Sequence, residues 1–399
     1  MNTKSLEPAL NLNKEQANKL IQSYIEKNDP NEIFEMIINA LMKSERSEFL
    51  RNQEEPNNKA NGYRPRTKIG MKRSLALSIP RDRLGIFKPF ILGILNQEQE
   101  LLNELAFSLY GNGLSTSQTS RIIEETFGKK YCKASISNIT KEFKEYVKMW
   151  LERQLDQVYP IVFIDALFLK VRRDTVASEA FYVVLGVKKD LTREVLAVVN
   201  MPTESATGWE DIFKKLQERG VKKVGLFVSD DLKGIGGAIE KTFQDSDHQK
   251  CIVHFKRNLL KKLRKKDRED FLKAIKQVFN PDFPFNDIPE QVDYLKRVLA
   301  QFSIRYPALK QTIKRDDLFK YFTYLKYDVS IRRMIYSTNW IERFNKSVKR
   351  TTKIRNSFPS PESAIALIGF VAMDLGENHY SYPIKIFAND KKILKFSNE

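Results

Sequence analysis

Cysteine and histidine are scarce in this 399-residue chain, which has two cysteines, Cys132 and Cys251, and three histidines. Two thiols cannot form the disulfide framework of a small secreted protein, so we expect a reducing compartment. A structural zinc site is hard to assemble from so few nitrogen and sulfur donors. Long apolar runs are also missing, since no stretch reaches the ~18 residues of a membrane-spanning helix and the N-terminus lacks the apolar part of a signal peptide. We therefore expect a soluble cytoplasmic protein with no membrane partner.

Acidic residues are outnumbered: 68 lysines and arginines face 50 aspartates and glutamates, which gives a formal net charge of +18. Each cation that neutralises a phosphate releases counterions, so this excess favours a polyanionic partner such as nucleic acid. A protein that binds anionic membrane surfaces could carry a similar charge. With 42% hydrophobic residues the chain can bury a sizeable core, and its length suggests two or three domains.

The first part of the chain combines helical and irregular patterns. Apolar residues at helical spacing predict two short amphipathic helices within residues 15–50, separated near Pro30. Residues 51–70 are rich in Asn, Pro, Gly and charge without periodicity, which predicts a linker or extended arm. Its basic end includes Arg64 and Arg66, which either lie along a DNA backbone or are simply solvated.

A short strand and a helical region follow. Residues 74–85 alternate apolar and polar side chains and end in a turn, and residues 97–155 are helical in pattern throughout. Within the latter, two helices are separated by a short turn near Gly128, and Ser135 or Ser137 is the expected cap of the second. This suits a helix-turn-helix, in which the second helix enters the major groove, but a generic helical hairpin has the same pattern. In a helix-turn-helix the outward residues would be Ser135, Ser137, Asn138 and Lys141.

From residue 159 onward the pattern predicts an α/β domain with a mixed sheet. Three strand-like runs separated by charged turns form a meander, and two helix–strand units follow it. The expected strands are 161–171, 179–187, 193–201, 221–229 and 249–255, and the expected helices are 207–220 and 234–243. A long, basic and helical region extends over about 256–335, and a final helical stretch begins near Asn339.

Three acidic residues occupy comparable places in this pattern. Asp165 interrupts the apolar run "YPIVFIDALFLKV", Asp230 ends the fourth strand, and Glu342 lies near the start of the late helix. A carboxylate in a buried strand costs several kcal/mol unless it is paired, protonated or bound to a metal. Strand ends and helix starts of one sheet converge, and three carboxylates gathered there would repel unless a divalent cation lies between them. Hard oxygen ligands suit Mg²⁺, and two such ions could clamp the attacking and leaving oxygens of a phosphodiester.

Each acid also has a purely structural interpretation. Asp165 could face solvent on an edge strand, although its neighbours are mostly apolar. Asp230 or Asp231 could cap the helix that follows. Glu342 could belong to a capping box with Asn339 as its cap.

Cys251 and His254 are separated by two residues in "CIVHFKRN". Zinc would need two further ligands, which the chain can hardly supply. A buried cysteine with a histidine at the end of a strand is one interpretation. The other is that His254 lies beside a phosphate site, where it orients the phosphate or supports a carboxylate ligand.

Five stretches together resemble the bacterial insertion-sequence transposases of the Mutator-like superfamily. They are "NGYRPRTKIG", "SIPRDRLGIFKP", "FIDALFLKVR", "GLFVSDDLKGIGGAIEKTFQDSDHQKCIVHFKRNLL" and "STNWIERFNKSVKRTTKIRNSFPS". They extend from about residue 60 to 360, in the order and at the intervals of that superfamily.

The resemblance implies an RNase H-like mixed-sheet core, interrupted by an all-helical insertion and preceded by a helical, helix-turn-helix-like DNA-binding region. Its DDE triad corresponds to Asp165, Asp230 and Glu342, which would hold Mg²⁺, or Mn²⁺ as a substitute, as two ions. The family's C/D(2)H signature corresponds to Cys251 and His254, its "TNxIE" asparagine to Asn339, and a recurrent tryptophan to Trp209. Two positions depart from the pattern: Asp231 replaces a small residue, and Leu232 stands where His or Gly is frequent.

The expected domain organisation follows from the same resemblance. It comprises an N-terminal helical region (1–60), a DNA-binding region (61–155), the first part of the core (156–255), the helical insertion (256–335) and the final core helices with the C-terminal tail (336–399). Around Glu342, the late helix carries a basic stripe that would follow DNA into the site or is merely solvated. The residues of this stripe are Arg343, Lys346, Lys349 and Arg350.

The expected function is DNA transposition in a bacterial cytoplasm, at the nucleoid. The protein would bind double-stranded DNA at the terminal inverted repeats, cleave it, and transfer strands to target DNA as a homodimer or larger assembly. Two alternatives remain open on the sequence: a catalytically silent DNA-binding regulator, and another RNase H-like nuclease without strand transfer.

Overall fold

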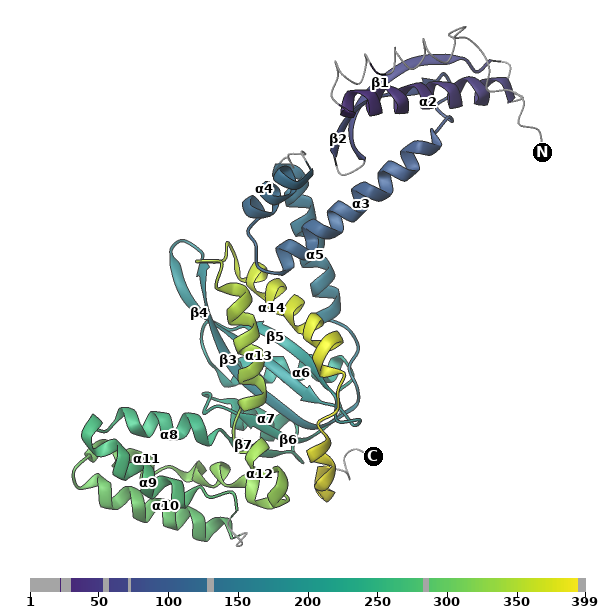
Figure 1. The fold of residues 1–399 in the computed structure, drawn as a ribbon. Coiled ribbons are helices and arrows are strands. Elements are labelled where there is room, and N and C mark those ends of the chain that lie inside the picture. The colour runs from purple at the N-terminus through teal and green to yellow at the C-terminus, as the bar shows by residue number, and fades with distance from the viewer. Residues whose placement is uncertain are drawn as a thin grey trace. The chain divides into compact units, whose positions relative to one another are not determined.

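The chain is described here by a computed structural model that covers residues 22, 30–52, 57–70, 73–127, 133–282 and 287–393. It divides into two compact units, the first made of Met1–Tyr110 with Ser115–Thr140 and the second of Gly111–Leu114 with Lys141–Glu399. Figure 1 shows the elements of each unit. The first helix expected within residues 15–50, Gly128 and Cys132 lie outside the described residues.

The first unit contains a two-stranded antiparallel sheet. Helix α2 (Pro30–Asn52) is followed by strands β1 (Ala60–Gly70) and β2 (Arg73–Asp82), which pair with each other. The prediction of a linker or extended arm over residues 51–70 is therefore wrong for β1. This strand has few apolar residues of its own, and its partner β2 supplies the apolar side chains.

Helix α2 packs along β2 and satisfies backbone groups of that strand. Glu35 accepts a hydrogen bond from the amide of Ala76 (2.7 Å), and Asn39 accepts one from the amide of Ser78 (2.8 Å). Glu35 and Asn39 are four residues apart and so lie on one face of the helix. Edge-strand N–H groups that would otherwise need water are thereby bonded within the unit.

Helices α3 (Phe90–Gly111), α4 (Thr116–Phe127) and α5 (Lys133–Leu151) follow. Ser115 and Gln118 form a capping box at the start of α4, because the Ser115 hydroxyl accepts from the Gln118 amide and the Gln118 side chain accepts from the Ser115 amide. The predicted caps of the next helix, Ser135 and Ser137, are wrong. Both residues lie inside α5, whose apolar residues pack with those of α3 and α4 in a small core of Ala106, Ile123, Ile136 and Ile139.

The second unit is built on a five-stranded mixed sheet with the order β5-β4-β3-β6-β7. Strand β3 pairs antiparallel with β4, and β4 pairs antiparallel with β5, as the predicted meander requires. Strands β6 and β7 are added in parallel on the other side of β3. The bounds are β3 Val158–Arg172, β4 Val176–Val187, β5 Arg193–Asn200, β6 Lys223–Ser229 and β7 Asp247–Lys250.

Helices cover both faces of this sheet. Alternate residues of β3 point to opposite faces, so Val162 and Ile164 join one core with α6 (Ala206–Glu218) and α7 (Ile235–Thr242). Ile161, Phe163 and Leu167, which point to the opposite face, join a second core with α13 (Asn339–Thr352) and α14 (Pro361–Leu375). Figure 1 shows α13 and α14 crossing one face of the sheet. Asp165 has the parity of Phe163 and therefore belongs to the face under α13.

The expected fifth strand, residues 249–255, is only partly correct. Strand β7 ends at Lys250, Cys251 is the N-cap of α8, and α8 spans Ile252–Lys261. The apolar run that suggested a strand has its buried residues Ile252, Phe255 and Leu259 at helical spacing. His254 therefore lies in the first turn of a helix.

Between Lys250 and Asn339 the described residues form helices and no strand. The last two long helices, α13 and α14, then return to the sheet, and α13 begins at Asn339 as predicted. The bounds are α9 Arg268–Val278, α10 Ile288–Ser303, α11 Lys310–Ile313, α12 Val329–Ile335, α13 Asn339–Thr352 and α14 Pro361–Leu375. The short 3₁₀ helices are η1 Lys265–Asp267, η2 Pro307–Leu309, η3 Asp316–Tyr321, η4 Thr323–Lys326 and η6 Lys385–Asn389, and η5 Gly376–Tyr380 is a π-helix.

Candidate active site

The parallel register of β3 and β6 brings Asp165 and Asp230 to the same level. Ile164 is aligned with Ser229 in this pair, and an aspartate follows each of them. Adjacent strands lie about 4.8 Å apart, so the two residues occupy neighbouring positions where β6 ends. Because β3 is the central strand of the sheet, the interpretation of Asp165 as a solvent-facing residue of an edge strand is wrong.

Asp165 is buried, with 5% of its surface exposed, and both of its oxygens accept hydrogen bonds. Oδ1 accepts from the amide of Ala166 (2.9 Å), and Oδ2 accepts from Nδ2 of Asn345 on α13 (2.7 Å). The pKa of Asp165 is raised to about 7, first by burial and then by the negative charges of Asp230 and Glu342, while the nearby His254 acts in the opposite direction. Three carboxylates from distant parts of the chain therefore interact in this site.

His254 lies between the other two acids. Its Nδ1 forms an ion pair with Oδ1 of Asp230 and is 3.3 Å from Sγ of Cys251, and its Nε2 is 3.7 Å from Oε1 of Glu342. Hydrogen bonds with Asp230 and Cys251 raise the pKa of His254 to about 10, although burial lowers it. The imidazole is therefore a cation at neutral pH, held among the carboxylates.

The start of α13 is tied to the start of α8 through a thiol. Thr338 is the N-cap of α13, and its hydroxyl donates to Sγ of Cys251 (3.4 Å). The capping box with Asn339 as cap is therefore wrong, and Asn339 is an exposed residue of the first turn. Glu342 lies one turn along the helix, 28% exposed, with its side chain near His254.

Asp230 and Asp231 have different partners. Neither caps α7, whose N-cap is Gly234, so that interpretation is also wrong. Asp231 pairs with Lys250 (2.5 Å) and with Arg315 (2.5 Å), whereas Asp230 faces His254. The unusual acid at position 231 thus belongs to a separate ion-pair network.

Comparison with known protein families identifies the family of this chain. A family profile described as "Transposase, Mutator family" matches residues 6–381. The chain belongs to the Mutator family of transposases.

Named transposases align with most of the length of this Mutator-family transposase. The transposase for insertion sequence element IS905 of Lactococcus lactis is 32% identical, over 86% of this chain and 89% of that protein. The transposase for IS256 in Tn4001 of Staphylococcus aureus is 31% identical, over 96% of this chain and 98% of that protein. A solved structure, the Drosophila P element transposase strand transfer complex, matches 70% of this chain and 91% of that chain with 10% identity and a TM-score of 0.31, too low to establish a shared fold.

Trp209 of this Mutator-family transposase lies away from the acids. It is fully buried on α6, where it packs edge-on against Tyr182 (4.9 Å between ring centroids) and with tilted ring planes against Phe213. These residues belong to the core on the face of the sheet opposite to Asp165. The structure therefore places Trp209 in the core and not beside the acids.

Asn345 is the site residue that the sequence did not reveal. It is buried on α13 and donates to Asp165, while its own Oδ1 has no hydrogen-bond partner among the described residues. The signal was its position three residues after Glu342, which places both on one helix face.

The side chains expected to bind DNA are mostly at the surface of their own elements. Arg343, Lys346, Lys349 and Arg350 are exposed on α13; Ser137, Asn138 and Lys141 are exposed on α5, where Ser135 is half-buried; Arg64 and Arg66 are exposed on β1. Lys346 and Lys349 follow Glu342 by four and seven residues and share its side of the helix. None of the helices that the structure describes is long and apolar enough to span a membrane.

Proposed function

We propose that this chain is a DDE transposase of a bacterial insertion sequence, which cleaves DNA at the element ends and joins it to target DNA. One observation carries the proposal: Asp165, Asp230 and Glu342, from three distant segments, interact electrostatically around His254. Membership in the Mutator family supports transposition, and the relatives named above act on insertion sequences.

The fold that we propose is an RNase H-like core with an all-helical insertion over residues 256–335. It is supported by a sheet with an antiparallel meander, parallel strands added beyond β3, and helices on both faces. The position of Asp165 on the central strand and of Asp230 after its parallel neighbour agrees with this assignment.

The three carboxylates suit a hard divalent cation by their chemistry, whereas the ligand atoms that lie within 4.8 Å of one another among the described residues are those of Asp230, Cys251 and His254. Asp165, Asp230 and Glu342 would hold Mg²⁺, or Mn²⁺ in its place, as two ions, because carboxylate oxygens are their preferred protein ligands. The buried Oδ1 of Asn345 leaves one further oxygen acceptor available in the site. When bound, the ions supply Lewis acidity that lowers the pKa of the attacking water or hydroxyl and neutralises developing charge. Cys251 bonds Thr338 and His254 and holds Asp230 in place through the latter.

The proposed reaction has two phosphoryl transfers. First, a water oxygen bonds to phosphorus at the element end and the P–O3′ bond breaks, which leaves a 3′-hydroxyl and a 5′-phosphate. Second, that 3′-hydroxyl attacks a target phosphodiester, a new P–O3′ bond forms, and the 3′-oxygen of the target strand leaves. In both transfers the nucleophile loses its proton to water and the leaving oxygen takes one from water. Asn345 keeps the Asp165 carboxylate oriented throughout.

The DNA partners would be held by basic and polar side chains. The exposed cations of α13 would contact phosphates beside Glu342, and the exposed residues of α5 would enter the major groove at the terminal repeats if α4 and α5 act as a helix-turn-helix. Because transposition joins two ends, we expect a homodimer or larger assembly on double-stranded DNA, at the nucleoid.

Substitution of each acid tests the proposal. Asp165→Asn, Asp230→Asn and Glu342→Gln should each reduce Mg²⁺-dependent cleavage and joining of end-containing DNA by roughly 10²-fold or more, because the ions contribute several kcal/mol of charge stabilisation. Asp211→Asn, at an exposed position of α6, is the matched control and should retain both activities. A folded variant of any of the three acids with near wild-type rates would contradict its role, and cleavage without joining would favour a plain nuclease.

A further inference from the structure

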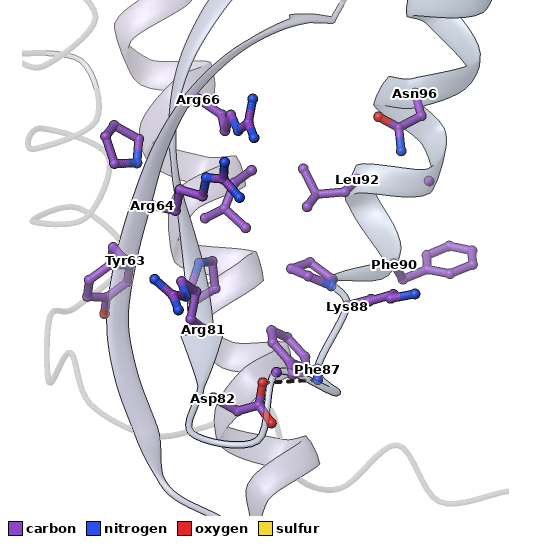
Figure 2. Close-up of a pocket in the computed structure, with 16 residues that line it drawn as sticks. Tyr63, Arg64, Arg66, Arg81, Asp82, Phe87, Lys88, Phe90, Leu92 and Asn96 are labelled. Carbon is purple, nitrogen blue, oxygen red and sulfur yellow. Dashed lines mark hydrogen bonds between the residues drawn. The ribbon is translucent and has the colours of Figure 1, made fainter.

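The first unit contains a groove of about 850 Å³ between the β-hairpin and the start of α3. Its walls are β1, β2, the loop after Asp82 and the first turns of α3, all within one unit. Figure 2 shows Arg64 and Arg66 projecting from the hairpin into the space in front of Leu92 and Asn96 of α3.

The groove has a rigid frame. The guanidinium of Arg46, which is buried on α2, donates to the carbonyl oxygens of Gly62 and Arg81 (both 3.0 Å) and so joins the two strands. Asp82 is buried at the end of β2, and its carboxylate accepts from Asn58 and from the amides of Ile86 and Phe87. The loop that closes one end of the groove is thereby fixed, and this carboxylate already accepts three hydrogen bonds.

The strand register explains why cations line the groove. Arg64 is opposite Ile79 and Arg66 is opposite Leu77, so the arginines lie on the same face of the sheet as these apolar residues of β2. Leu77 packs in the core with α2 and α3. A face covered by a helix normally carries apolar residues on both strands, but β1 carries cations at alternate positions. Alternate residues of a strand are about 6.6 Å apart, comparable to successive phosphates of an extended nucleic-acid strand.

Four cationic side chains line the groove, and Asp82 is the acidic residue among its described lining residues. Arg64, Arg66, Arg81 and Lys88 line it, and in the part of the chain that the structure describes none of these four side chains forms an ion pair with a carboxylate. Cations that are held on a rigid frame without counter-ions favour an anionic occupant with several charges.

We infer that this groove binds the sugar–phosphate backbone of DNA, independently of base sequence. The inference rests on the proposed function, because it assumes that the protein works on DNA. Beside the expected contacts of α5 and α13, it assigns Arg64 and Arg66 to one groove that also contains Arg81 and Lys88.

The test is the salt dependence of DNA binding by the full-length protein. The double variant Arg64→Gln/Arg66→Gln is compared with Lys43→Gln/Arg51→Gln, which removes the same charge from exposed positions of α2 outside the groove. Anisotropy of a fluorescein-labelled DNA of scrambled sequence, as a duplex and as a single strand, is recorded with EDTA over a salt series. Circular dichroism checks that both variants are folded.

In a plot of the logarithm of the association constant against the logarithm of the salt concentration, the negative slope of the groove variant should be shallower by about 2. This corresponds to a roughly 30-fold loss of affinity near 0.15 M salt, whereas the control variant should keep the wild-type slope. If the groove variant loses affinity for both duplex and single-stranded DNA, the groove contacts the sugar–phosphate backbone that the two forms share. If it loses affinity for one form alone, that form is the occupant of the groove. Equal behaviour of the two variants overturns the inference and leaves the proposed function standing. Failure of the wild-type protein to bind DNA at all overturns both.

Discussion

Replacing Lys250 by methionine should destabilise the second unit, because it removes the centre of the ion-pair network beside the acids. Lys250 ends β7 with only 7% of its side chain exposed, and its ammonium group contacts both Asp231 and Asp317. Arg315 bonds the same two carboxylates, through Nη2 to Asp231 (2.9 Å) and Nε to Asp317 (2.8 Å). The network thus joins the loop after Asp230, the residue before Cys251 and the helical region.

The size of this destabilisation depends on the charges that remain when Lys250 is replaced. Removing one partner of a fully buried ion pair costs about 3–5 kcal/mol. Here the side chains of Asp231 and Asp317 are 30% and 35% exposed and keep Arg315, so we expect a loss of roughly 1–3 kcal/mol in the free energy of unfolding at pH 7. Burial raises the pKa of Asp231, but hydrogen bonds from Arg315 and Lys250 outweigh it and lower the pKa to about 2 from 3.8. Because the pKa of Asp231 is lowered in the folded state, its ionised carboxylate stabilises the fold above pH 3.8, and this stabilisation is lost as the pH falls toward 2. The cost of replacing Lys250 should therefore become smaller as the pH falls from 3.8 to 2.

Urea denaturation followed by tryptophan fluorescence measures this cost. All three tryptophans, Trp150, Trp209 and Trp340, belong to the second unit, so the signal reports on that unit. Lys326→Met is the matched control, since Lys326 is half exposed and its ion pair with Asp247 should contribute less than about 1 kcal/mol. The reasoning is refuted if Lys250→Met costs no more than Lys326→Met, or if its cost is the same at pH 7 and near pH 3.

Three further predictions concern residues that were assigned to the candidate site from the sequence or from the structure. Asn345→Ala should slow cleavage by roughly 10- to 100-fold, because Asp165 loses a charge-assisted hydrogen bond of 2.7 Å; a near wild-type rate would show that this bond is dispensable. The pKa of Asp165 is raised to about 7 from 3.8, chiefly by burial, so without metal the folded protein keeps a proton on Asp165 that the unfolded chain loses. The stability of the fold therefore falls as the pH rises from 3.8 to about 7. The rise in melting temperature caused by Mn²⁺ should therefore grow from about pH 5 to pH 8 in scanning fluorimetry, and a shift independent of pH would contradict this. Trp209→Phe should cost about 1–2 kcal/mol of stability through lost volume and leave the cleavage rate of the folded protein unchanged; a large drop in rate would place Trp209 in the site after all.

Local periodicity was sufficient to predict the sheet and the positions of two acids. The continuous apolar run around Asp165 on β3 marked it as a buried carboxylate, and the end of β6 marked Asp230. Both features depend only on residues that are close in the sequence, so they can be recognised without the structure. The same reasoning failed at β7, because a short apolar run such as "CIVHF" is compatible with a strand or with the first turns of a helix.

Contacts between distant residues could not be predicted in this way. Asp231 is paired with Lys250 and with Arg315, and Arg315 follows it by 84 positions in the chain. Strand β1 was missed for a related reason, since its polar sequence becomes a strand only by pairing with β2. Asn345 could have been proposed from the sequence, because it lies one helical turn from Glu342. Only the structure shows that its side chain contacts Asp165.

The presence of metal ions among the three acids can be observed directly by anomalous scattering at the manganese edge, in crystals of the full-length protein with DNA and Mn²⁺. We expect manganese peaks coordinated by the carboxylate oxygens of Asp165, Asp230 and Glu342. A map with no peak among these three side chains, or with a peak held by Cys251 and His254 without Asp165, would contradict the assignment of the active site.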